Sequence, residues 1–421
     1  MITRRAFAAG SAALASSLAA PAALGQARPR LVVVGGGAGG ATLAKYAAWT
    51  TNAAIDVTLI DASDSYTTCF HSNLYVAGFK SLEELTHSHE ALAKYGVRKV
   101  KGFAQAIDRD RKQVVLSDGT RVPYDRLALS PGVDLDYDSV PGWSKALEEK
   151  APHAWKAGPQ TRLLVDLIDE VPDGGTIIMV APPNPYRCPP GPYERVSMIA
   201  YRLKNTKREK AKIIIIDPKE TYSKQALFQA GWEAHYHGMV EWLGPKVHEG
   251  VKEVRVDKGE VVTGFDTFGG ASLINVIPAQ MAGAIARDAG LADKSRFCPI
   301  EPDSMRSKMD GNIQVIGDSC IAGDMPKSGF AANAQAKVAA MALRVDLLGA
   351  RAFQPRFFNT CWSLIEPGDC VKVGGVYVPK DGKIATLQGF VSKLDESQDL
   401  RQKQSDENLG WYKSMAQDCF G

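Results

Sequence analysis

The feature that most constrains the fold is a glycine-rich turn placed directly after an apolar run near the start of the chain. Residues 31–34 (Leu-Val-Val-Val) lead straight into Gly-Gly-Gly-Ala-Gly-Gly at 35–40. A stretch of small, helix-forming residues, 41–49, follows, and a second apolar run, 57–61, comes after it. Strand, glycine turn, helix and strand within about thirty residues is the setting in which a G-x-G-x-x-G motif binds a dinucleotide. The pattern predicts a dinucleotide-binding domain, against the alternative of a purely structural glycine turn.

Each residue of this motif has a physical task. Gly35 permits the tight turn, Gly37 lets the backbone approach a pyrophosphate, and Gly40 lets the helix pack closely on the strand. Unpaired N–H groups at the start of the helix then face the phosphates. Asp61 ends the second strand, where a carboxylate can accept a hydrogen bond from a ribose hydroxyl. We expect these four residues to bind the cofactor.

A second motif, near the far end of the chain, favours FAD as the dinucleotide. The apolar run 313–316 ends in Gly317-Asp318. FAD folds of the glutathione-reductase type use such an aspartate to bind the ribitol or pyrophosphate of the cofactor, and residues 127–132 are similar to the segment beneath it. An alanine-rich helix opens at 328–330, and its positive dipole end would stabilise charge on a reduced flavin. An ordinary connection between strand and helix is the alternative.

The middle of the chain predicts a second unit of the same kind without its nucleotide site. Residues 176–180 and 212–217 have the pattern of strands, with a helix around 194–203 between them. The turn after the first strand, 181–192, is rich in proline where NADH-using relatives of this architecture carry glycine. Proline has no N–H and a fixed φ, so this loop cannot cradle a pyrophosphate. We therefore expect electrons from a donor other than NAD(P)H.

These patterns predict an α/β protein with two Rossmann-like domains of the glutathione-reductase type and a small C-terminal α+β domain. A chain of 421 residues is too long for one core. We predict an FAD-binding domain in two parts, 28–145 and 266–350, and a second Rossmann-like domain lacking the NAD glycine motif at 146–265. Residues 351–421 show no repeating βα pattern and are predicted to form a C-terminal interface domain.

The N-terminus predicts export. Arg4-Arg5 precedes a weakly apolar Ala/Leu/Ser stretch, 8–20, and small residues suited to cleavage, which is typical of a Tat signal peptide over 1–27. An amphipathic helix that stays attached is the alternative. A Tat signal implies a periplasmic protein that is exported folded. The net charge of +3 indicates no nucleic-acid partner, and after the first thirty residues no apolar run is long enough to span a membrane.

The cysteines argue against a metal. They are widely dispersed with no C-x-x-C pair, so neither a zinc site nor a c-type haem is expected on this chain. In an oxidising compartment distant cysteines can pair, and an odd count leaves at least one unpaired or bonded to something else. The seven are Cys69, Cys188, Cys298, Cys320, Cys361, Cys370 and Cys419.

Four segments together carry a resemblance to a known family. The chain resembles the flavin-binding subunit of flavocytochrome c sulfide dehydrogenase and, more distantly, sulfide:quinone oxidoreductase. The likeness covers essentially the whole chain after the signal peptide. Its most specific segments are Tyr66–Asn73, Tyr186–Arg195, Met325–Gly329 and Asn359–Cys361.

The resemblance implies roles for three cysteines. It implies that Cys69 bonds the flavin 8α-methyl group as a thioether, and that Cys188 and Cys361 form a redox-active disulfide at the flavin. From the residues alone, a small buried hydrophobe is the alternative for Cys69. Cys188 and Cys361 lie far apart in the sequence, so spacing cannot show that they pair, and a purely structural disulfide is the alternative.

Two charged residues in these segments are further candidates. Glu194, near the start of a predicted helix, could be the base that keeps hydrosulfide or a cysteine deprotonated. It could equally be a carboxylate that stabilises the start of a helix. Lys327 could stabilise the reduced flavin anion or be a surface lysine. We expect Cys298 and Cys320 to be structural, as buried thiols or a second pair.

The leading hypothesis is a periplasmic sulfide dehydrogenase subunit. Hydrosulfide would attack a Cys188–Cys361 disulfide, and FAD would pass single electrons to a c-type cytochrome on a separate subunit with one or two haems. One alternative is a sulfide:quinone oxidoreductase, which the polar C-terminal segment, 393–407, disfavours. Another is a non-catalytic accessory flavoprotein of a sulfur-oxidation complex, which the presence of both cysteines disfavours.

Overall fold

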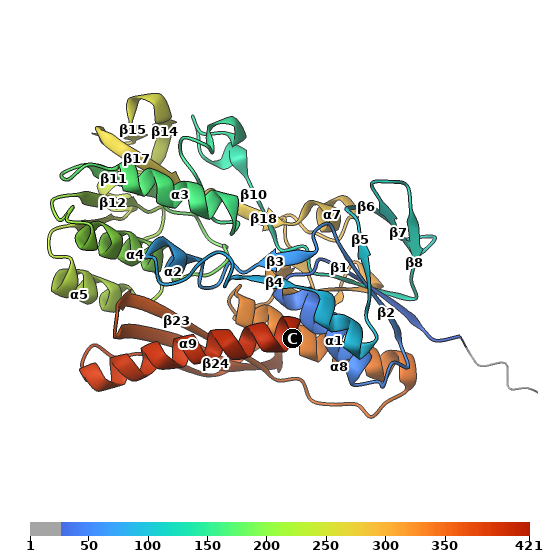
Figure 1. The fold of residues 1–421 in the computed structure, drawn as a ribbon. Helices are drawn as coiled ribbons and strands as arrows, with labels where there is room; N and C mark the ends of the chain where they lie inside the picture. Colours follow the sequence, from blue (N-terminus) through green and yellow to red (C-terminus); the bar gives the residue numbers. More distant parts are fainter. Residues whose placement is uncertain (1–26) are drawn as a thin grey trace, which may run out of the picture.

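A computed structural model describes residues 27–421, so the predicted signal peptide, apart from Ala27, lies outside the described residues. Two parallel sheets, each accompanied by helices, form the body of the molecule. An antiparallel sheet and a long helix run along one side of both (Figure 1). This arrangement confirms the predicted α/β fold class with two Rossmann-like units and a smaller C-terminal α+β unit.

The first sheet is built around the glycine motif. Its strand order is β20-β21-β9-β1-β2-β5, and all pairings are parallel except that of β20 with β21. Four consecutive residues of β1 are buried, because helices α1 and α8 cover one face and other elements the opposite one. The bounds are β1 Arg30–Val34, β2 Asp56–Asp61, β5 Arg98–Lys101, β9 Arg126–Leu129, β20 Arg306–Ser307, β21 Asp310–Val315, α1 Ala38–Trp49 and α8 Gly329–Leu348.

The strand that leads to Asp318 ends earlier than its apolar run predicts. β21 stops at Val315, and a short 3₁₀ turn, Gly317–Ser319, follows it. Gly317 has φ +72°, a left-handed conformation that extended strand cannot accommodate. Its N–H donates to Gln335 Oε1 on α8 at 2.7 Å, which holds the turn against the helix.

The second sheet has the order β13-β12-β11-β17, and all its pairings are parallel. β11 covers Thr176–Val180, the predicted strand, and α4 begins at Gly191, three residues before the predicted helix. Pro192 suits the first turn because that turn has no use for its missing N–H. The other bounds are β12 Lys212–Ile216, β13 Val240–Leu243, β17 Ala271–Val276, α3 Pro159–Glu170, α4 Gly191–Asn205 and α5 Gln225–His235.

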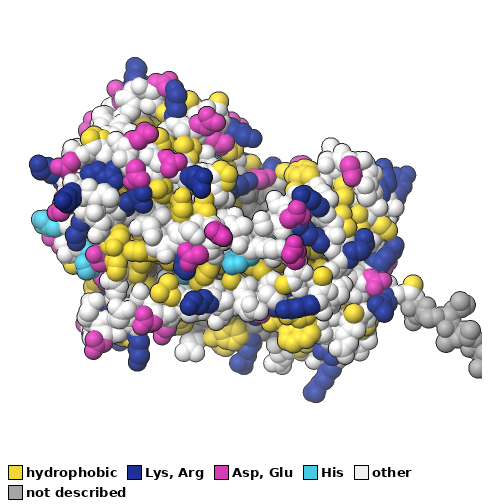
Figure 2. Space-filling model, in the orientation of Figure 1, with side chains coloured by type: hydrophobic (Ala, Val, Ile, Leu, Met, Phe, Trp, Pro, Cys, Tyr) yellow, Lys and Arg dark blue, Asp and Glu magenta, His cyan; other side chains and the backbone are white. Residues whose placement is uncertain are grey.

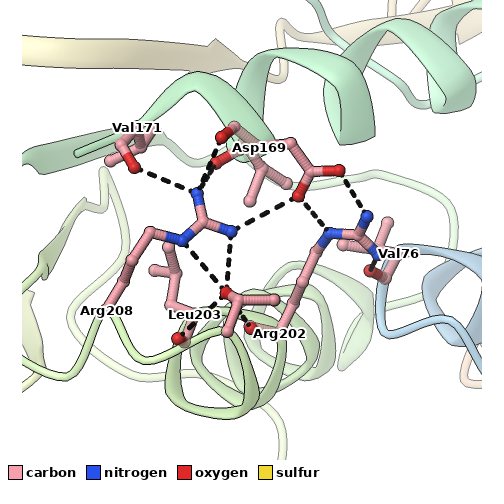
Figure 3. Close-up of polar contacts among 8 residues, drawn as sticks. Val76, Asp169, Val171, Arg202, Leu203 and Arg208 are labelled. Carbon is pink, nitrogen blue, oxygen red and sulfur yellow. Dashed lines mark hydrogen bonds and ion pairs between the residues drawn. The ribbon is translucent and has the colours of Figure 1, made fainter. Parts of the chain in front are cut away.

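Two arginines at the end of α4 fix the neighbouring helices (Figure 3). Arg202 donates to both carboxylate oxygens of Asp169 on α3, at 2.7 and 2.5 Å, and to the carbonyl of Val76 at the end of α2 (Ser72–Val76) at 3.3 Å. Arg208 donates to the carbonyl of Val171 at 3.0 Å, capping the last turn of α3. The short helix α2, which follows Cys69, is thereby held against the second sheet's helices.

The C-terminal unit is a three-stranded antiparallel meander and one long helix. β23 (Phe357–Glu366), β24 (Asp369–Lys380) and β25 (Lys383–Val391) pair in order, and α9 (Gln398–Phe420) packs on β23 and β24. β23 contacts α4 of the second unit and α8 of the first. At its far end, α9 brings Phe420 against Tyr66, with ring centroids 5.8 Å apart.

The remaining elements are short. They are β3 Ser65–Thr67, β4 Thr86–Ser88, β6 Ala104–Asp108, β7 Gln113–Leu116, β8 Arg121–Pro123, β10 Val133–Leu135, β14 Val251–Arg255, β15 Glu260–Thr263, β16 Thr267–Phe268, β18 Gln280–Ala282, β19 Cys298–Pro299, β22 Cys320–Ile321, α6 Pro245–His248 and α7 Ala284–Asp288. On the face that Figure 2 displays, acidic and basic side chains are interspersed. No helix between residues 27 and 421 is both long enough and apolar enough to cross a bilayer.

Candidate active site

A cavity of about 420 Å³ opens at the carboxyl ends of β1, β9 and β21, where open α/β sheets bind ligands. We call it the glycine-turn cavity. Its lining comes from four groups of residues that are far apart in the sequence. They are the turn Gly35–Gly39, the segment Asp61–Cys69, the loop Ser130–Val133 with Arg187, and Gly317, Asp318, Gly329 and Ala332.

Close backbone contacts require glycine at two of the three predicted positions, and a side-chain ring lies close to the third. Gly35 has φ +98°, and a Cβ there would lie 2.4 Å from the carbonyl oxygen of Ser130. A Cβ on Gly40 would lie 1.8 Å from the carbonyl oxygen of Gly35, so only glycine lets α1 start this close to the turn. At Gly37 a Cβ would lie 3.3 Å from the ring of Tyr66, on the cavity side. A side chain at this position would therefore crowd the ring of Tyr66.

Two aspartates flank this cavity with different hydrogen bonding. Asp61 accepts from the N–H of Gly36 at 2.6 Å and of Ser63 at 2.7 Å, which braces the glycine turn. Asp318 is desolvated: its Oδ1 is buried with no partner among the described residues, and Arg187 Nη1 lies 4.0 Å from its Oδ2. Burial raises the pKa of Asp318. An unpaired buried acceptor in a glycine-lined cradle fits a cofactor that brings hydroxyl groups and phosphates.

A second, narrower cavity of about 70 Å³ adjoins the first, and we call it the thiol cavity. Cys69, Arg187 and Gly329 line both cavities, so one wall is common to them. Aromatic side chains cover its other side, with Trp411 packed on Phe70, Phe330 and Trp362 at centroid distances of 5.4 to 6.0 Å. The thiol cavity also contains Cys188, Cys361, Glu194, Arg195, Trp155 and His71.

Cys188 is held rigidly by the proline-framed loop between β11 and α4. Its φ is +58°, uncommon for a residue with a side chain, and its N–H donates to the carbonyl of Lys327 at 2.8 Å. The N–H of Gly191 in turn donates to the Cys188 carbonyl at 2.7 Å. Burial raises the pKa of the Cys188 thiol. The chain thus presents this sulfur at the carboxyl end of β11, as the loop composition indicates.

Cys361 reaches the same cavity from β23 of the C-terminal unit. Its sulfur lies 3.5 Å from the side-chain amide nitrogen of Asn359, two residues earlier on the same face of the strand. The structure therefore brings Cys188 and Cys361 together, and both are free thiols in it. The disulfide that the resemblance implies remains a prediction.

Glu194 lies in the first turn of α4 and also lines the thiol cavity. Its carboxylate accepts from the Asn73 amide at 2.8 Å and from the backbone N–H of Leu364 at 3.1 Å. Burial raises the pKa of Glu194, and these two hydrogen bonds oppose the rise. The position suits both interpretations made from the sequence, a base and a helix-start carboxylate.

Lys327 lies within the described chain but lines neither cavity. Its ammonium donates to the carbonyls of Asp318 at 2.8 Å and Cys320 at 2.6 Å, and it stands 4.1 Å from the ring centroid of Phe297. It therefore holds the loop after β21. Arg187, which lines both cavities, supplies the cation nearest to the Asp318 carboxylate.

Sequence reasoning missed four residues of this site: Arg187, Asn73, Trp155 and Lys224. Arg187 and Asn73 stand inside segments already singled out, next to Cys188 and four residues after Cys69. Trp155 and Lys224 lie outside any motif, and only tertiary contacts reveal them. Lys224 is buried, and its ammonium donates to the carbonyl of Cys361 at 3.1 Å.

Side chains pack closely at the carboxyl end of β12, the end of a parallel strand at which open α/β sheets bind ligands. At the end of β12, Asp217 is fully buried and accepts from Tyr193 at 2.6 Å and from Trp242 at 2.9 Å. Tyr193 stacks on Tyr222 with ring centroids 3.7 Å apart. Lys219 contacts the same carboxylate at 2.6 Å. This packing agrees with the absence of a glycine turn between β11 and α4.

The other cysteines are buried and line neither cavity. Cys298 and Cys320 face each other across the β19–β22 pair and are free thiols, and burial raises the pKa of both. Cys370 and Cys419 are also buried free thiols. No cluster of three or more His, Cys, Asp or Glu side chains within residues 27–421 is arranged to hold a metal ion.

Three family models match successive parts of the chain. "Pyridine nucleotide-disulphide oxidoreductase" matches residues 29–156, which contain the glycine turn. "Sulfide dehydrogenase [flavocytochrome c] flavoprotein chain, central" matches residues 161–278, which contain Cys188 and Glu194. "Flavocytochrome c sulphide dehydrogenase, flavin-binding" matches residues 353–420, which contain Cys361. The chain belongs to the flavocytochrome c sulfide dehydrogenase flavoprotein family. This confirms the predicted family and the prediction of a flavin-dependent oxidoreductase.

Other proteins are also similar to this member of the flavocytochrome c sulfide dehydrogenase family, in sequence or in structure. The mitochondrial sulfide:quinone oxidoreductase of Dictyostelium discoideum is 21% identical over 305 residues, 69% of this chain and 65% of that protein. Ferroptosis suppressor protein 1 of Taeniopygia guttata is 37% identical over 110 residues, 25% of this chain and 27% of that protein. The sulfide:quinone oxidoreductase structure from Aquifex aeolicus superposes with a TM-score of 0.70 at 16% identity, covering 93% and 92% of the two chains. That likeness shows the fold.

Proposed function

We propose that this chain is the flavin-binding subunit of a periplasmic sulfide dehydrogenase, which oxidises hydrosulfide at Cys188 and Cys361 and passes the electrons through FAD to a c-type cytochrome subunit. One observation carries the proposal. Two thiols from distant parts of the chain share a cavity whose wall, made by Cys69, Arg187 and Gly329, also bounds the glycine-turn cavity. A dithiol next to a flavin is the arrangement that thiol-disulfide redox chemistry needs.

The chain's own residues supply the first chemical step. With Cys188 and Cys361 joined as a disulfide, hydrosulfide attacks one sulfur, the S–S bond breaks, and one cysteine keeps a persulfide while the other leaves as a thiolate. The disulfide is reduced and the sulfide sulfur is oxidised. Glu194 accepts the proton of H₂S or of a cysteine thiol, since its carboxylate lines the cavity.

FAD held by Gly35, Gly37, Gly40, Asp61 and Asp318, with Cys69 as a thioether to the flavin, would supply a two-electron acceptor that donates single electrons. Arg187 lines both cavities and offsets negative charge beside Asp318. The cytochrome partner is supported by the family description and by the lack of a C-x-x-C-H haem motif in the sequence. The periplasmic location is supported by the arginine pair, Arg4-Arg5, in the signal-like N-terminus.

The test is sulfide-dependent reduction of a c-type cytochrome by the purified flavoprotein with its co-expressed cytochrome. We expect Cys188→Ser and Cys361→Ser each to abolish turnover, and Cys298→Ser, a buried thiol away from both cavities, to retain it. NADH should not replace sulfide, because the turn between β11 and α4 lacks the glycine motif and side chains pack closely around Asp217. Unchanged turnover in either cavity variant would support an accessory flavoprotein instead.

A further inference from the structure

The sulfur of Cys361 has a dedicated hydrogen-bond donor, and that of Cys188 has none among the described residues. Asn359 is buried, with 2% of its surface exposed, and its Nδ2 lies 3.5 Å from Cys361 Sγ. The backbone of Cys188 is hydrogen-bonded, its N–H to Lys327 and its carbonyl to Gly191, but within residues 27–421 no hydrogen bond involves its sulfur. The two thiols of one cavity therefore stand in unequal surroundings.

The orientation of the Asn359 amide is fixed by a helix cap. Ser328 is the N-cap of α8, and its Oγ accepts from the N–H of Ala331 at 3.0 Å. Its hydroxyl proton is therefore left to donate to Asn359 Oδ1, at 2.5 Å. With the oxygen so engaged, the NH₂ end of the amide points to Cys361. The same oxygen lies 3.9 Å from the sulfur, within reach of an S–H donor, so one amide can serve the thiol as well as the thiolate.

We propose that Asn359 is a catalytic residue, and Ser328 its positioning residue, which together stabilise Cys361 as the thiolate that leaves when hydrosulfide attacks Cys188. The inference rests on the proposed function for its substrate and goes further in assigning the two sulfurs. The new bond joins the hydrosulfide sulfur to Cys188 Sγ, and the electron pair of the broken S–S bond goes to Cys361 Sγ. Neutral amide donors stabilise a sulfur anion without adding a titrating group.

The charges around the cavity support this assignment. Burial raises the pKa of both thiols; at Cys361 the Asn359 amide and the Lys224 ammonium oppose the rise. Glu194 adds to the rise in pKa at both thiols. At Cys188 the neighbouring Cys361 adds to it as well, and the Arg187 guanidinium opposes it. The titratable and charged groups that face Cys361 or line its cavity are Cys69, His71, Arg187, Cys188, Glu194, Arg195, Lys224 and Tyr377.

The experiment measures thiol ionisation and needs no sulfide. The reduced holoprotein is alkylated with iodoacetamide over a pH series, and mass spectrometry of the peptides gives separate rates for Cys361 and Cys188. We expect Cys361 to ionise at lower pH than Cys188. Asn359→Leu should raise the apparent pKa of Cys361 by about one unit, lowering its alkylation rate about tenfold below that pKa, and leave the Cys188 profile in place.

Ser328→Ala keeps the Asn359 amide but removes the hydroxyl that fixes its orientation. We therefore expect the apparent pKa of Cys361 to rise in this variant too, by a smaller amount than in Asn359→Leu. This variant also answers the question if Asn359→Leu fails to fold. The proposal would be overturned if the apparent pKa of Cys361 were unchanged in the folded variants. It would also be overturned if Cys188 ionised at lower pH than Cys361 in the wild type. A chain that shows the expected pKa gap but does not oxidise sulfide would disprove the proposed function and leave the role of Asn359 standing.

Discussion

The side-chain amide of Asn73 donates to Glu194 Oε2 at 2.8 Å, which ties the helix after Cys69 to the helix after Cys188. The other oxygen of that carboxylate accepts from the backbone of Leu364, on the strand that carries Cys361. One buried carboxylate thus joins the three segments that bring a cysteine to the thiol cavity. Its raised pKa brings Glu194 closer to the range in which a general base works at neutral pH.

We expect Glu194→Gln to lower sulfide turnover by about two orders of magnitude, the usual effect of losing a general base. A base must be ionised, so the wild-type kcat/KM should fall as the pH drops through the raised pKa of Glu194, and the variant should lose this acidic limb. Glu209→Gln, an exposed change after the same helix, is the control. An unchanged acidic limb in Glu194→Gln would mean that the carboxylate only stabilises the start of α4.

Cys69 is predicted to hold the flavin through a covalent bond. After acid precipitation of the purified protein, flavin absorbance should stay with the wild-type pellet. In Cys69→Ala it should move to the supernatant, because the glycine turn and Asp318 can still bind FAD but nothing bonds it. Flavin released from the wild-type pellet would refute the thioether.

Acid should weaken the fold partly through His71. Its ring is buried and stacks on Tyr412 at a centroid distance of 4.5 Å, and burial lowers the pKa of His71 from 6.5 to about 4. As the pH falls, His71 is therefore protonated in the unfolded chain at a higher pH than in the folded protein. The neutral ring's contribution to the free energy of unfolding is fully present above pH 6.5 and is lost as the pH falls to about 4. The total loss is up to roughly 3 kcal/mol.

The variant His71→Gln should therefore show a shallower decline in unfolding free energy between these two pH values. Denaturant unfolding at a series of pH values measures it. The exposed His237→Gln is the matched control and should follow the wild type. If the His71→Gln and wild-type curves run parallel, the buried ring does not carry this dependence.

The hydrogen bonds between Arg202 and Asp169 in Figure 3 should have a measurable but small effect on stability. The hydrogen bond from Arg202 lowers the pKa of Asp169, but 45% of the aspartate side chain is exposed. We expect Asp169→Asn to cost about 1 kcal/mol at pH 7, with the cost shrinking as the pH falls below the usual aspartate pKa. Asp166→Asn, one turn earlier on α3, should cost less in the same unfolding assay, because the Asp166 side chain makes no hydrogen bond in residues 27–421 and acts on Arg202 only through its charge.

Local sequence patterns were sufficient wherever the chemistry is local. The glycine turn is predictable because Gly35 and Gly40 meet backbone atoms that the turn itself supplies or brings near. β11 was predictable because a short apolar run bounded by glycine and proline has few other conformations. The same kind of pattern extended the strand before Asp318 too far, because apolar character does not report the left-handed φ of Gly317.

The composition of the thiol cavity depends instead on contacts between distant segments. Nothing near Trp155 or Lys224 in the sequence marks either residue. Trp155 lines the cavity, and Lys224 donates to the carbonyl of Cys361, only because distant segments pack together. Lys327 is the opposite case, a residue in a distinctive segment that does not line either cavity. Its ammonium donates to the carbonyls of Asp318 and Cys320. The cysteines could be predicted from sequence motifs, whereas the residues around them depend on tertiary contacts.

The contact between Phe420 and Tyr66 has a consequence for biosynthesis. Tyr66 forms part of the wall of the glycine-turn cavity and packs on the end of α9, the last helix in the chain order. On the ribosome, the first sheet and its glycine turn emerge hundreds of residues before that support exists. We therefore expect stable binding of the cofactor to follow synthesis of α9, because only then is Tyr66 supported by Phe420.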